Sequence, residues 1–278
     1  MAKRAFLVGI NRYRIAGADL RGCVNDVKDL GAALVAFHGF KKSDITVLTD
    51  LAATKKAMQA GITALVRASK KGDVAVLHYS GHGSHVPDDN GDESDGRNEI
   101  LCPTDLDWND PFRDDWLRKT LDGLRAGVSF TAIMDCCHSG SNTRAFLPPD
   151  APVKERYLPS PSSLKAVESG RGLPRTVTSE LRSSPRASRK AKDIVNANLP
   201  EVLITGCRDT QTSADAFIKG SYNGAFTYFL CKHVRDTEGK AVRSELLKRL
   251  RASLRYEGYD QAPQLEGAAE ARKKPLFA

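Results

Sequence analysis

The sequence predicts an α/β fold in which a mostly parallel central sheet is covered by helices on both faces. Short apolar runs of strand type alternate with segments of helical period, which is the pattern of repeated βαβ units. With 278 residues, 41% of them hydrophobic, the chain can bury a large core without disulfides or metals. This composition excludes a disordered or fibrous protein, and no apolar run is long enough to span a membrane.

Five apolar runs are expected to form the strands of this sheet. The first of them is Ala5–Ile10, which we interpret as a strand and not as a signal peptide, because it is short and the polar pair Asn11-Arg12 follows. The other four runs are Ile45–Leu48, Val74–Tyr79, Phe130–Met134 and Val202–Thr205.

Apolar residues recur at helical spacing in the intervals around these strands. The first helix would end at Gly39, and the second would be capped by Thr54 and end by Gly72. The inward-facing residues of the first three helices would be Val27, Leu30, Leu34 and Phe37; Ala57, Met58, Ile62, Leu65 and Val66; and Leu117, Leu121 and Leu124. Two more helices are expected around Gly224–Val234 and Ser244–Tyr256.

A long segment at 142–199 interrupts this alternation and is expected to be a flexible basic linker. It is rich in Pro, Ser and Arg and has little periodicity. Within it, residues 171–192 carry seven Arg and Lys against Glu180 alone, so they hold six of the eight net positive charges. This local charge favours a solvated loop, and a nucleic-acid partner is not expected because aromatic interleaving and a recognition element are both missing.

The cysteines bear on the compartment of the protein. The six of them lack paired C-x-x-C spacing, which favours reduced thiols over a disulfide framework. Reduced thiols predict a cytoplasmic protein. We also expect it to have no membrane partner and to be a monomer.

Two of the predicted strands end in residues suited to nucleophilic catalysis. His82 lies just after the Val74–Tyr79 strand, and Cys137 lies just after the Phe130–Met134 strand. Parallel strands present their carboxyl ends at one edge of a sheet, where ligands bind. A thiol needs a nearby base to react at neutral pH, and a histidine on a neighbouring strand end supplies one. The backbone N–H groups of Gly83 and Cys137 could then form an oxyanion hole.

These two strand ends together resemble the catalytic pair of the metacaspases, which are caspase-like cysteine peptidases. The matching segments are 79–84 (YSGHGS) and 135–140 (DCCHSG), and further blocks resemble the family in order at 20–27 (LRGCVNDV), 206–214 (GCRDTQTSA), 224–228 (GAFTY) and 261–265 (QAPQL). The resemblance implies a caspase-like three-layer sandwich and a single catalytic domain over 1–278. Residues 1–141 would be its large-subunit-like part and 200–278 its small-subunit-like part. The early first strand suggests a compact, prokaryote-type member, an orthocaspase.

The resemblance also implies which residue does what. Cys137 would be the nucleophile and His82 the base, and no third side chain of a triad is evident. Side chains alternate along an extended strand, so Asp135 and Cys137 would point one way and Cys136 into the opposite layer of the core. The alternative is a catalytically inactive caspase-like binding scaffold, which would usually have lost the cysteine or the histidine.

Substrate preference follows from the family's pocket positions, which fall here on Cys23, Asp26, Ser80 and Asp135. Two carboxylates beside the nucleophile attract a basic side chain and repel an acidic one. We therefore expect protein or peptide substrates with Arg or Lys before the cut bond. Self-cleavage is expected in the basic linker after Arg186, Arg189 or Lys190, where the scissile amide avoids a proline.

No cofactor is expected to be required. The acidic run at 88–99 is not an EF-hand, because Glu93 stands where the loop needs glycine. Some metacaspases bind calcium nearby, through acids that match Asn98, Asp114 and Asp115. Asn98 replaces one acid, and Arg144 falls where another would be, so we expect calcium to be at most a modest activator.

Overall fold

The computed structural model describes residues 1–88, 96–138, 152–168, 201–208 and 211–277. Its centre is a six-stranded sheet in which five neighbouring strands are parallel and the edge strand β12 is antiparallel to β9. In spatial order the strands are β12 (Gln264–Glu266), β9 (Glu201–Thr205), β7 (Ser129–Asp135), β3 (Val74–Ser80), β1 (Lys3–Gly9) and β2 (Ile45–Thr49).

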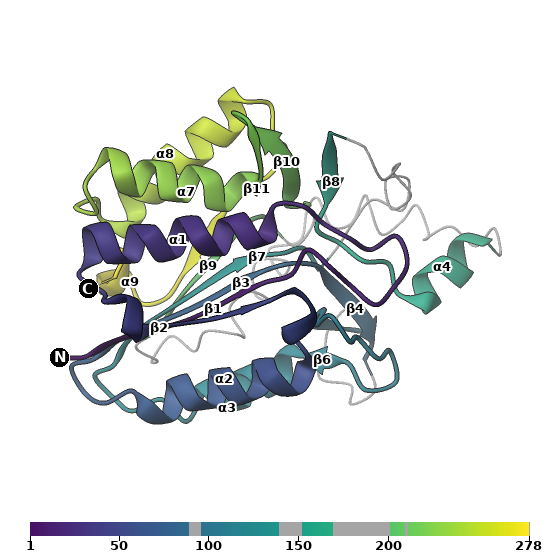
Figure 1. Ribbon diagram of the computed structural model, residues 1–278, viewed down its shortest axis with the longest axis horizontal. Coiled ribbons are helices and arrows are strands. Elements are labelled where there is room, and N and C mark those ends of the chain that lie inside the picture. Colours follow the sequence, from purple (N-terminus) through teal and green to yellow (C-terminus); the bar gives the residue numbers. More distant parts are fainter. Residues whose placement is uncertain (89–95, 139–151, 169–200, 209–210, 278) are drawn as a thin grey trace.

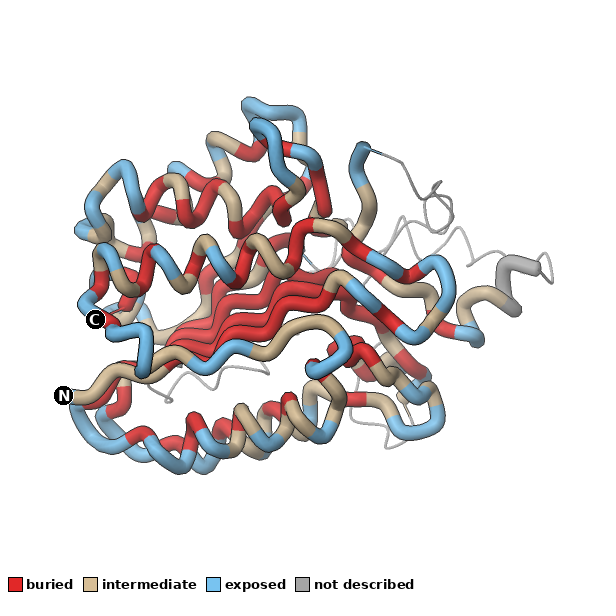
Figure 2. The backbone as a smooth tube through the Cα atoms, viewed as in Figure 1, coloured by how far each residue is buried: buried red, intermediate tan, exposed pale blue. Residues whose placement is uncertain are grey.

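Helices cover both faces of this sheet, so the molecule has three layers (Figure 1). On one face lie α1 (Cys23–His38), α7 (Ala225–Asp236), α8 (Arg243–Tyr256) and the short α9 (Ala269–Arg272). On the other face lie α2 (Lys55–Ala68) and α3 (Asp114–Leu121). The central strands are buried throughout while the helices bury one side only, as Figure 2 shows. The predicted three-layer α/β fold is confirmed.

Two of the predicted helix ends, the start of α2 and the end of α1, are confirmed. The Thr54 hydroxyl accepts a hydrogen bond from the N–H of Ala57 and so caps α2. Gly39 ends α1 in the left-handed conformation, at φ 66°, where a residue without Cβ is not strained. The expected end of α2 was too late, because the helix stops at Ala68 and not near Gly72.

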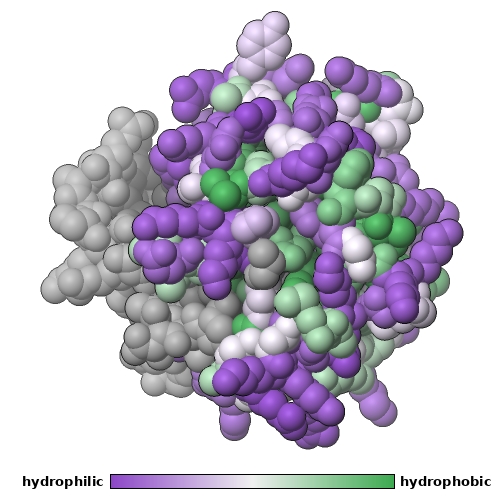
Figure 3. Space-filling model, turned by 90° about the vertical axis from the view of Figure 1, so that its left-hand side faces the viewer, coloured by the Kyte–Doolittle hydropathy of each residue, from purple (hydrophilic) through white to green (hydrophobic). Residues whose placement is uncertain are grey.

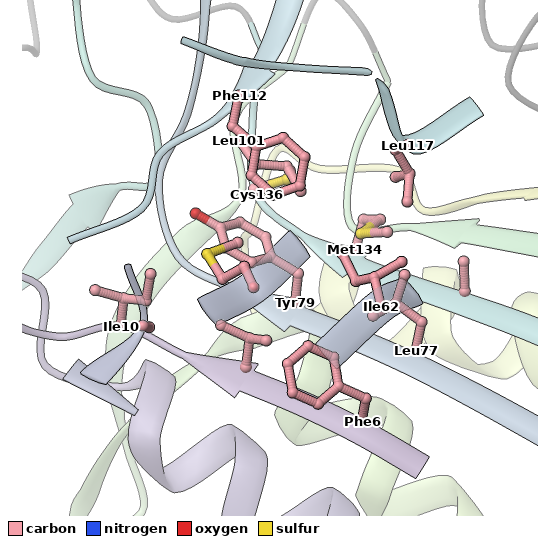
Figure 4. Close-up of a cluster of buried hydrophobic side chains, with 14 of the residues drawn as sticks. Phe6, Ile10, Ile62, Leu77, Tyr79, Leu101, Phe112, Leu117, Met134 and Cys136 are labelled. Atoms are coloured by element: carbon pink, nitrogen blue, oxygen red, sulfur yellow. The ribbon is translucent and has the colours of Figure 1, made fainter. Parts of the chain in front are cut away.

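Two large apolar clusters fill the spaces between the layers. The first lies between the sheet and α2 and α3, and Figure 4 shows part of it, including Phe6, Leu77 and Met134. The second packs α1, α7 and α8 against the other face. The strands β1, β3, β7 and β9 each contribute buried side chains to both clusters, which explains why they read as nearly continuous apolar runs.

Two small sheets that the sequence did not predict extend from the carboxyl edge of the central sheet. One joins β4 (Gly83–Pro87), β5 (Arg97–Leu101) and β6 (Phe112–Arg113). The other joins β11 (Ser221–Gly224), β10 (Ala214–Ile218) and β8 (Val153–Glu155). Their strands are short, and β8 pairs with β10 from a distant part of the chain.

The expectation of a continuous flexible linker over 142–199 is wrong for residues 152–168. These residues form β8, which pairs with β10, and α4 (Pro161–Glu168). The physical reason is the side chain of Arg156, whose burial fixes this segment. Residues 171–192, with the predicted cleavage sites Arg186, Arg189 and Lys190, lie outside the described residues.

The surface gives no sign of a membrane span. Within the described ranges, no helix has the length and apolar character needed to cross a bilayer. Figure 3 shows the side of the molecule that carries the chain termini; hydrophilic side chains predominate on it, with small apolar patches between them.

Candidate active site

The two predicted strand ends lie side by side. β3 and β7 are neighbours, and their last residues, Ser80 and Asp135, are register partners. His82 and Cys137 each follow two residues later, so both leave the same edge of the sheet. The pairing of β3 with β7 therefore brings the two strand ends together, as expected.

One carbonyl oxygen, that of Arg156, is held between these two segments. It accepts hydrogen bonds from the backbone N–H groups of Gly83 at 3.0 Å and Cys137 at 3.2 Å. These are the two donors that the sequence suggested for an oxyanion hole. A Cβ at position 83 would overlap the carbonyl oxygen of Cys137, so only glycine lets the two segments approach this closely. Two N–H groups converging on one carbonyl oxygen can stabilise negative charge there.

The His82 ring is buried and oriented by the backbone. Nε2 lies 2.7 Å from the carbonyl oxygen of Ala18, so it carries the proton, and Nδ1 keeps a lone pair with no hydrogen-bond partner. Burial lowers the pKa of the His82 imidazole to about 4, against the opposing effect of the Ala18 hydrogen bond. At neutral pH the ring is therefore uncharged and can accept a proton at Nδ1.

The partner that orients His82 could not be found by a search for side chains, because it is a main-chain carbonyl. The loop itself is held by two tyrosines. The His82 N–H donates to the Tyr13 hydroxyl at 2.8 Å, and the Tyr79 hydroxyl lies 2.6 Å from the His82 carbonyl oxygen.

The two adjacent cysteines face different surroundings. Cys137 is fully buried, and its Sγ accepts a hydrogen bond from the N–H of Ser213. Cys136 belongs to the apolar cluster beneath the sheet, next to Leu101 and Phe112 (Figure 4), and burial raises the pKa of its thiol. This is the alternation expected for an extended segment.

Arg156 fills a pocket beside Cys137, and its side chain is fully buried. Nη2 lies 2.8 Å from Asp26 and 3.0 Å from Asp215. Nη1 lies 3.1 Å from Asp135 and donates to the Ser80 hydroxyl at 2.7 Å. Three carboxylates thus surround one guanidinium, so the pocket strongly favours a positively charged side chain.

Three of the four predicted pocket residues contact Arg156 directly, and the fourth, Cys23, lies close by. The charge of Arg156 counteracts the rise that burial imposes on the pKa of the Cys23 thiol. Sequence reasoning missed Asp215, although an acid inside the apolar run 214–218 (ADAFI) is a signal of a buried, paired carboxylate. It also missed Arg156, which no motif marks.

The pocket carboxylates are held by N–H and O–H donors. Asp135 Oδ2 accepts from the Thr227 hydroxyl at 2.7 Å, and Asp26 Oδ1 accepts from the Gly224 N–H at 2.9 Å. Burial raises the pKa of Asp26 to about 7, with Arg156 acting in the opposite direction. Because a Cβ at position 224 would overlap Asp135 and the guanidinium, glycine there makes room for the arginine.

The three calcium candidates lie in β5 and at the start of α3. The Asn98 side chain is fully buried, and neither its amide oxygen nor its nitrogen has a hydrogen-bond partner. Asp114 and Asp115 open α3, which follows directly from the strand β6 that pairs with β5. Across the described part of the chain, no group of three or more His, Cys, Asp or Glu side chains could hold a metal ion.

The chain is similar in sequence and fold to known proteins. Residues 3–145 match the family model "Metacaspase, peptidase C14 domain". The chain is 32% identical to Metacaspase-1A of Neurospora crassa, over 99% of this chain and 64% of that protein. It is 31% identical to Metacaspase-1B of Neosartorya fischeri, over 95% of this chain and 68% of that protein. The chain thus spans about two thirds of the length of these relatives.

Solved structures are similar over nearly the whole chain. A crystal structure of a protein from Geobacter sulfurreducens matches with a TM-score of 0.71 and 27% identity, covering 100% of this chain and 99% of the other. Caspase-1 from Spodoptera frugiperda matches with a TM-score of 0.60 and 13% identity, covering 99% and 92%. At that identity the second match shows a shared caspase-like fold alone.

Proposed function

Because this chain belongs to the metacaspase family of C14 cysteine peptidases, we propose that it is an endopeptidase that cleaves proteins and peptides after arginine or lysine, through a Cys137–His82 dyad. One observation carries the proposal, and it is the position of Arg156. The guanidinium of Arg156 lies among three carboxylates, and its carbonyl oxygen lies between two N–H donors. The arginine before the cut bond of a substrate would place its side chain and its carbonyl oxygen in the same positions.

The residues around the carbonyl support a two-step reaction. Nδ1 of His82 takes the thiol proton of Cys137, and the thiolate sulfur bonds to the substrate carbonyl carbon. The N–H groups of Gly83 and Cys137 hold the resulting oxyanion. His82 returns the proton to the leaving amine as the C–N bond breaks, which leaves a thioester. Water, deprotonated by His82, then hydrolyses the thioester, releases the acid and restores the thiol.

The same site supports self-cleavage after Arg156. The Arg156 N–H donates to the Ser213 carbonyl oxygen at 3.0 Å, and β8 continues this pairing along β10. The backbone is therefore extended across the site, with the Arg156–Tyr157 bond next to Cys137. We propose this bond as a self-cleavage site in addition to those after Arg186, Arg189 and Lys190, which the sequence alone predicts.

Incubated wild-type protein is expected to yield a fragment that ends at Arg156 and another that begins at Tyr157. Mass spectrometry of the intact fragments checks this, and cuts inside 171–192 would be seen in the same spectrum. The fragments should stay associated, because β7 and β9 pair in the central sheet. Cys137→Ala protein should remain whole, and Arg156→Gln protein should lose the first cut only. A wild-type chain that hydrolyses arginine peptides but keeps the Arg156–Tyr157 bond would contradict this site.

Calcium is proposed to be unnecessary for activity and to be at most a modest activator. The support is the sequence at two ligand positions: Asn98 supplies an amide where an acid would bind more strongly, and Arg144 supplies a positive charge. Titration calorimetry with the wild type is expected to give weak binding or none, and Asn98→Asp is expected to strengthen it. Micromolar affinity in the wild type, together with activity that is lost on chelation, would refute the proposal.

A further inference from the structure

The geometry points to a second side-chain pocket, on the other side of the bond that lies over Cys137, and we infer that it selects an aromatic residue directly after the scissile bond. The inference rests on the proposed function, and it deepens it by naming a second substrate residue. The pocket is the place that Tyr157 occupies.

Tyr157 is fixed through its backbone beside the reacting groups. Its neighbours on both sides pair with Gly83: the Arg156 carbonyl accepts from the Gly83 N–H, and the Leu158 N–H donates to the Gly83 carbonyl at 3.0 Å. Residue 157 therefore runs parallel to β4. A substrate bound with its basic residue in the position of Arg156 would place its next residue here.

The Tyr157 side chain is enclosed, with only 5% of the residue exposed. It forms a small buried cluster with Cys137 and Cys207. Its ring is stacked on that of His85, with the centroids 5.8 Å apart and the planes at 22°. Sulfur atoms and an offset ring are favourable neighbours of an aromatic ring, and a short side chain would leave this space unfilled.

The wall of this pocket is itself held in place. Nδ1 of His85 lies 3.0 Å from the His138 carbonyl oxygen, and Nε2 lies 3.3 Å from the Ser163 hydroxyl of α4. The Tyr157 hydroxyl lies 3.3 Å from Nδ1, which is long for a hydrogen bond between these atoms. The stacked ring and the enclosed volume therefore contribute more to binding than the hydroxyl does. A substrate with phenylalanine after the scissile bond should be cleaved about as fast as one with tyrosine.

Internally quenched peptides test this pocket, because their leaving group is an ordinary amine and not an aromatic dye. Peptides that contain Arg–Tyr, Arg–Phe and Arg–Ala, and are otherwise identical, are compared by kcat/KM. Tyrosine and phenylalanine are expected to exceed alanine by at least about tenfold, since one missing methylene in an apolar pocket already changes this constant by about tenfold or more.

Substitutions of the wall separate the pocket from the rest of the site. His85→Ala is expected to bring the ratio of kcat/KM for the Arg–Tyr peptide to that for the Arg–Ala peptide (the Tyr/Ala ratio) close to one. His85→Phe keeps a ring to stack on and should retain most of the preference for tyrosine. His233→Ala, in α7, is the control for loss of a histidine and should keep the wild-type ratio. Within the chain itself, Tyr157→Ala should slow cleavage after Arg156 by at least about tenfold, and Tyr157→Phe should not.

A ratio near one in the wild type, with Arg–Ala hydrolysed, would overturn the aromatic pocket and leave the proposed peptidase function intact. A wild-type ratio that survives His85→Ala would also overturn it. Failure to hydrolyse any of the three peptides would instead overturn the proposed function, and with it this inference.

Discussion

Cys137→Ala protein is expected to lose peptide hydrolysis by at least about 10⁴-fold, the scale seen when a catalytic nucleophile is removed. The substitution leaves the two N–H donors around the Arg156 carbonyl unchanged but removes the only thiol at the end of β7 that faces Ser213. Initial rates on an arginine peptide measure the loss. A melting curve shows that the fold remains.

The adjacent cysteine is the matched control. Cys136→Ala protein should keep most of its activity and lose some stability, because the thiol lies in the apolar cluster beneath the sheet and its removal leaves a cavity. If Cys136→Ala were inactive and Cys137→Ala active, the assignment of the nucleophile would be wrong by one residue.

Asp135→Asn protein is expected to lose about 2–5 kcal/mol of transition-state binding for arginine peptides, the range measured when one partner of a buried charge pair is neutralised. At about 1.36 kcal/mol per factor of ten, this is a fall in kcat/KM between about 30-fold and several thousand-fold. The change keeps the shape of the pocket. The asparagine oxygen can take the hydrogen bonds of Oδ2 from Thr227, and its nitrogen replaces Oδ1, which has no hydrogen-bond partner.

Citrulline peptides separate charge from shape in this experiment, because citrulline resembles arginine but is neutral. The wild type should have a much higher kcat/KM for the arginine peptide than for the citrulline peptide. Asp135→Asn should reduce this difference in kcat/KM. Asp236→Asn, the same change on the exposed side of α7, should leave both rates alone. Equal losses for arginine and citrulline would mean that Asp135 acts through the structure of the pocket and not through its charge.

Much of the fold could be predicted because its strongest signals are local. The inner parallel strands β1, β3 and β7 are nearly continuous buried apolar runs, and the ends of α1 and α2 are marked by Gly39 and Thr54. The edge strand β12 has three residues and was missed, since so short a run carries no periodic signal. β8 was missed for a different reason: its position depends on the burial of Arg156 among residues far away in the sequence.

Some groups of the candidate active site could also be predicted from the sequence, and others could not. The strand-end positions of His82 and Cys137 follow from the alternation of strands and helices, and Asp26, Ser80 and Asp135 from the family resemblance. The carbonyl of Ala18 and the N–H of Ser213 could not be predicted, because main-chain groups leave no mark on residue identity. Asp215 was missed because its partner Arg156 comes from a segment that composition alone describes as a loop.

Hydrolysis of three peptides that differ only in the residue before the scissile bond, Arg, Lys or Asp, is the most direct test of a cysteine peptidase site selective for basic residues. The assay uses the wild-type protein both intact and after self-cleavage, with Cys137→Ala as the blank. The arginine and lysine peptides should be cleaved and the aspartate peptide should not, because Asp26, Asp135 and Asp215 would repel it. Preferred cleavage of the aspartate peptide, or equal rates for wild type and Cys137→Ala, would contradict the assignment.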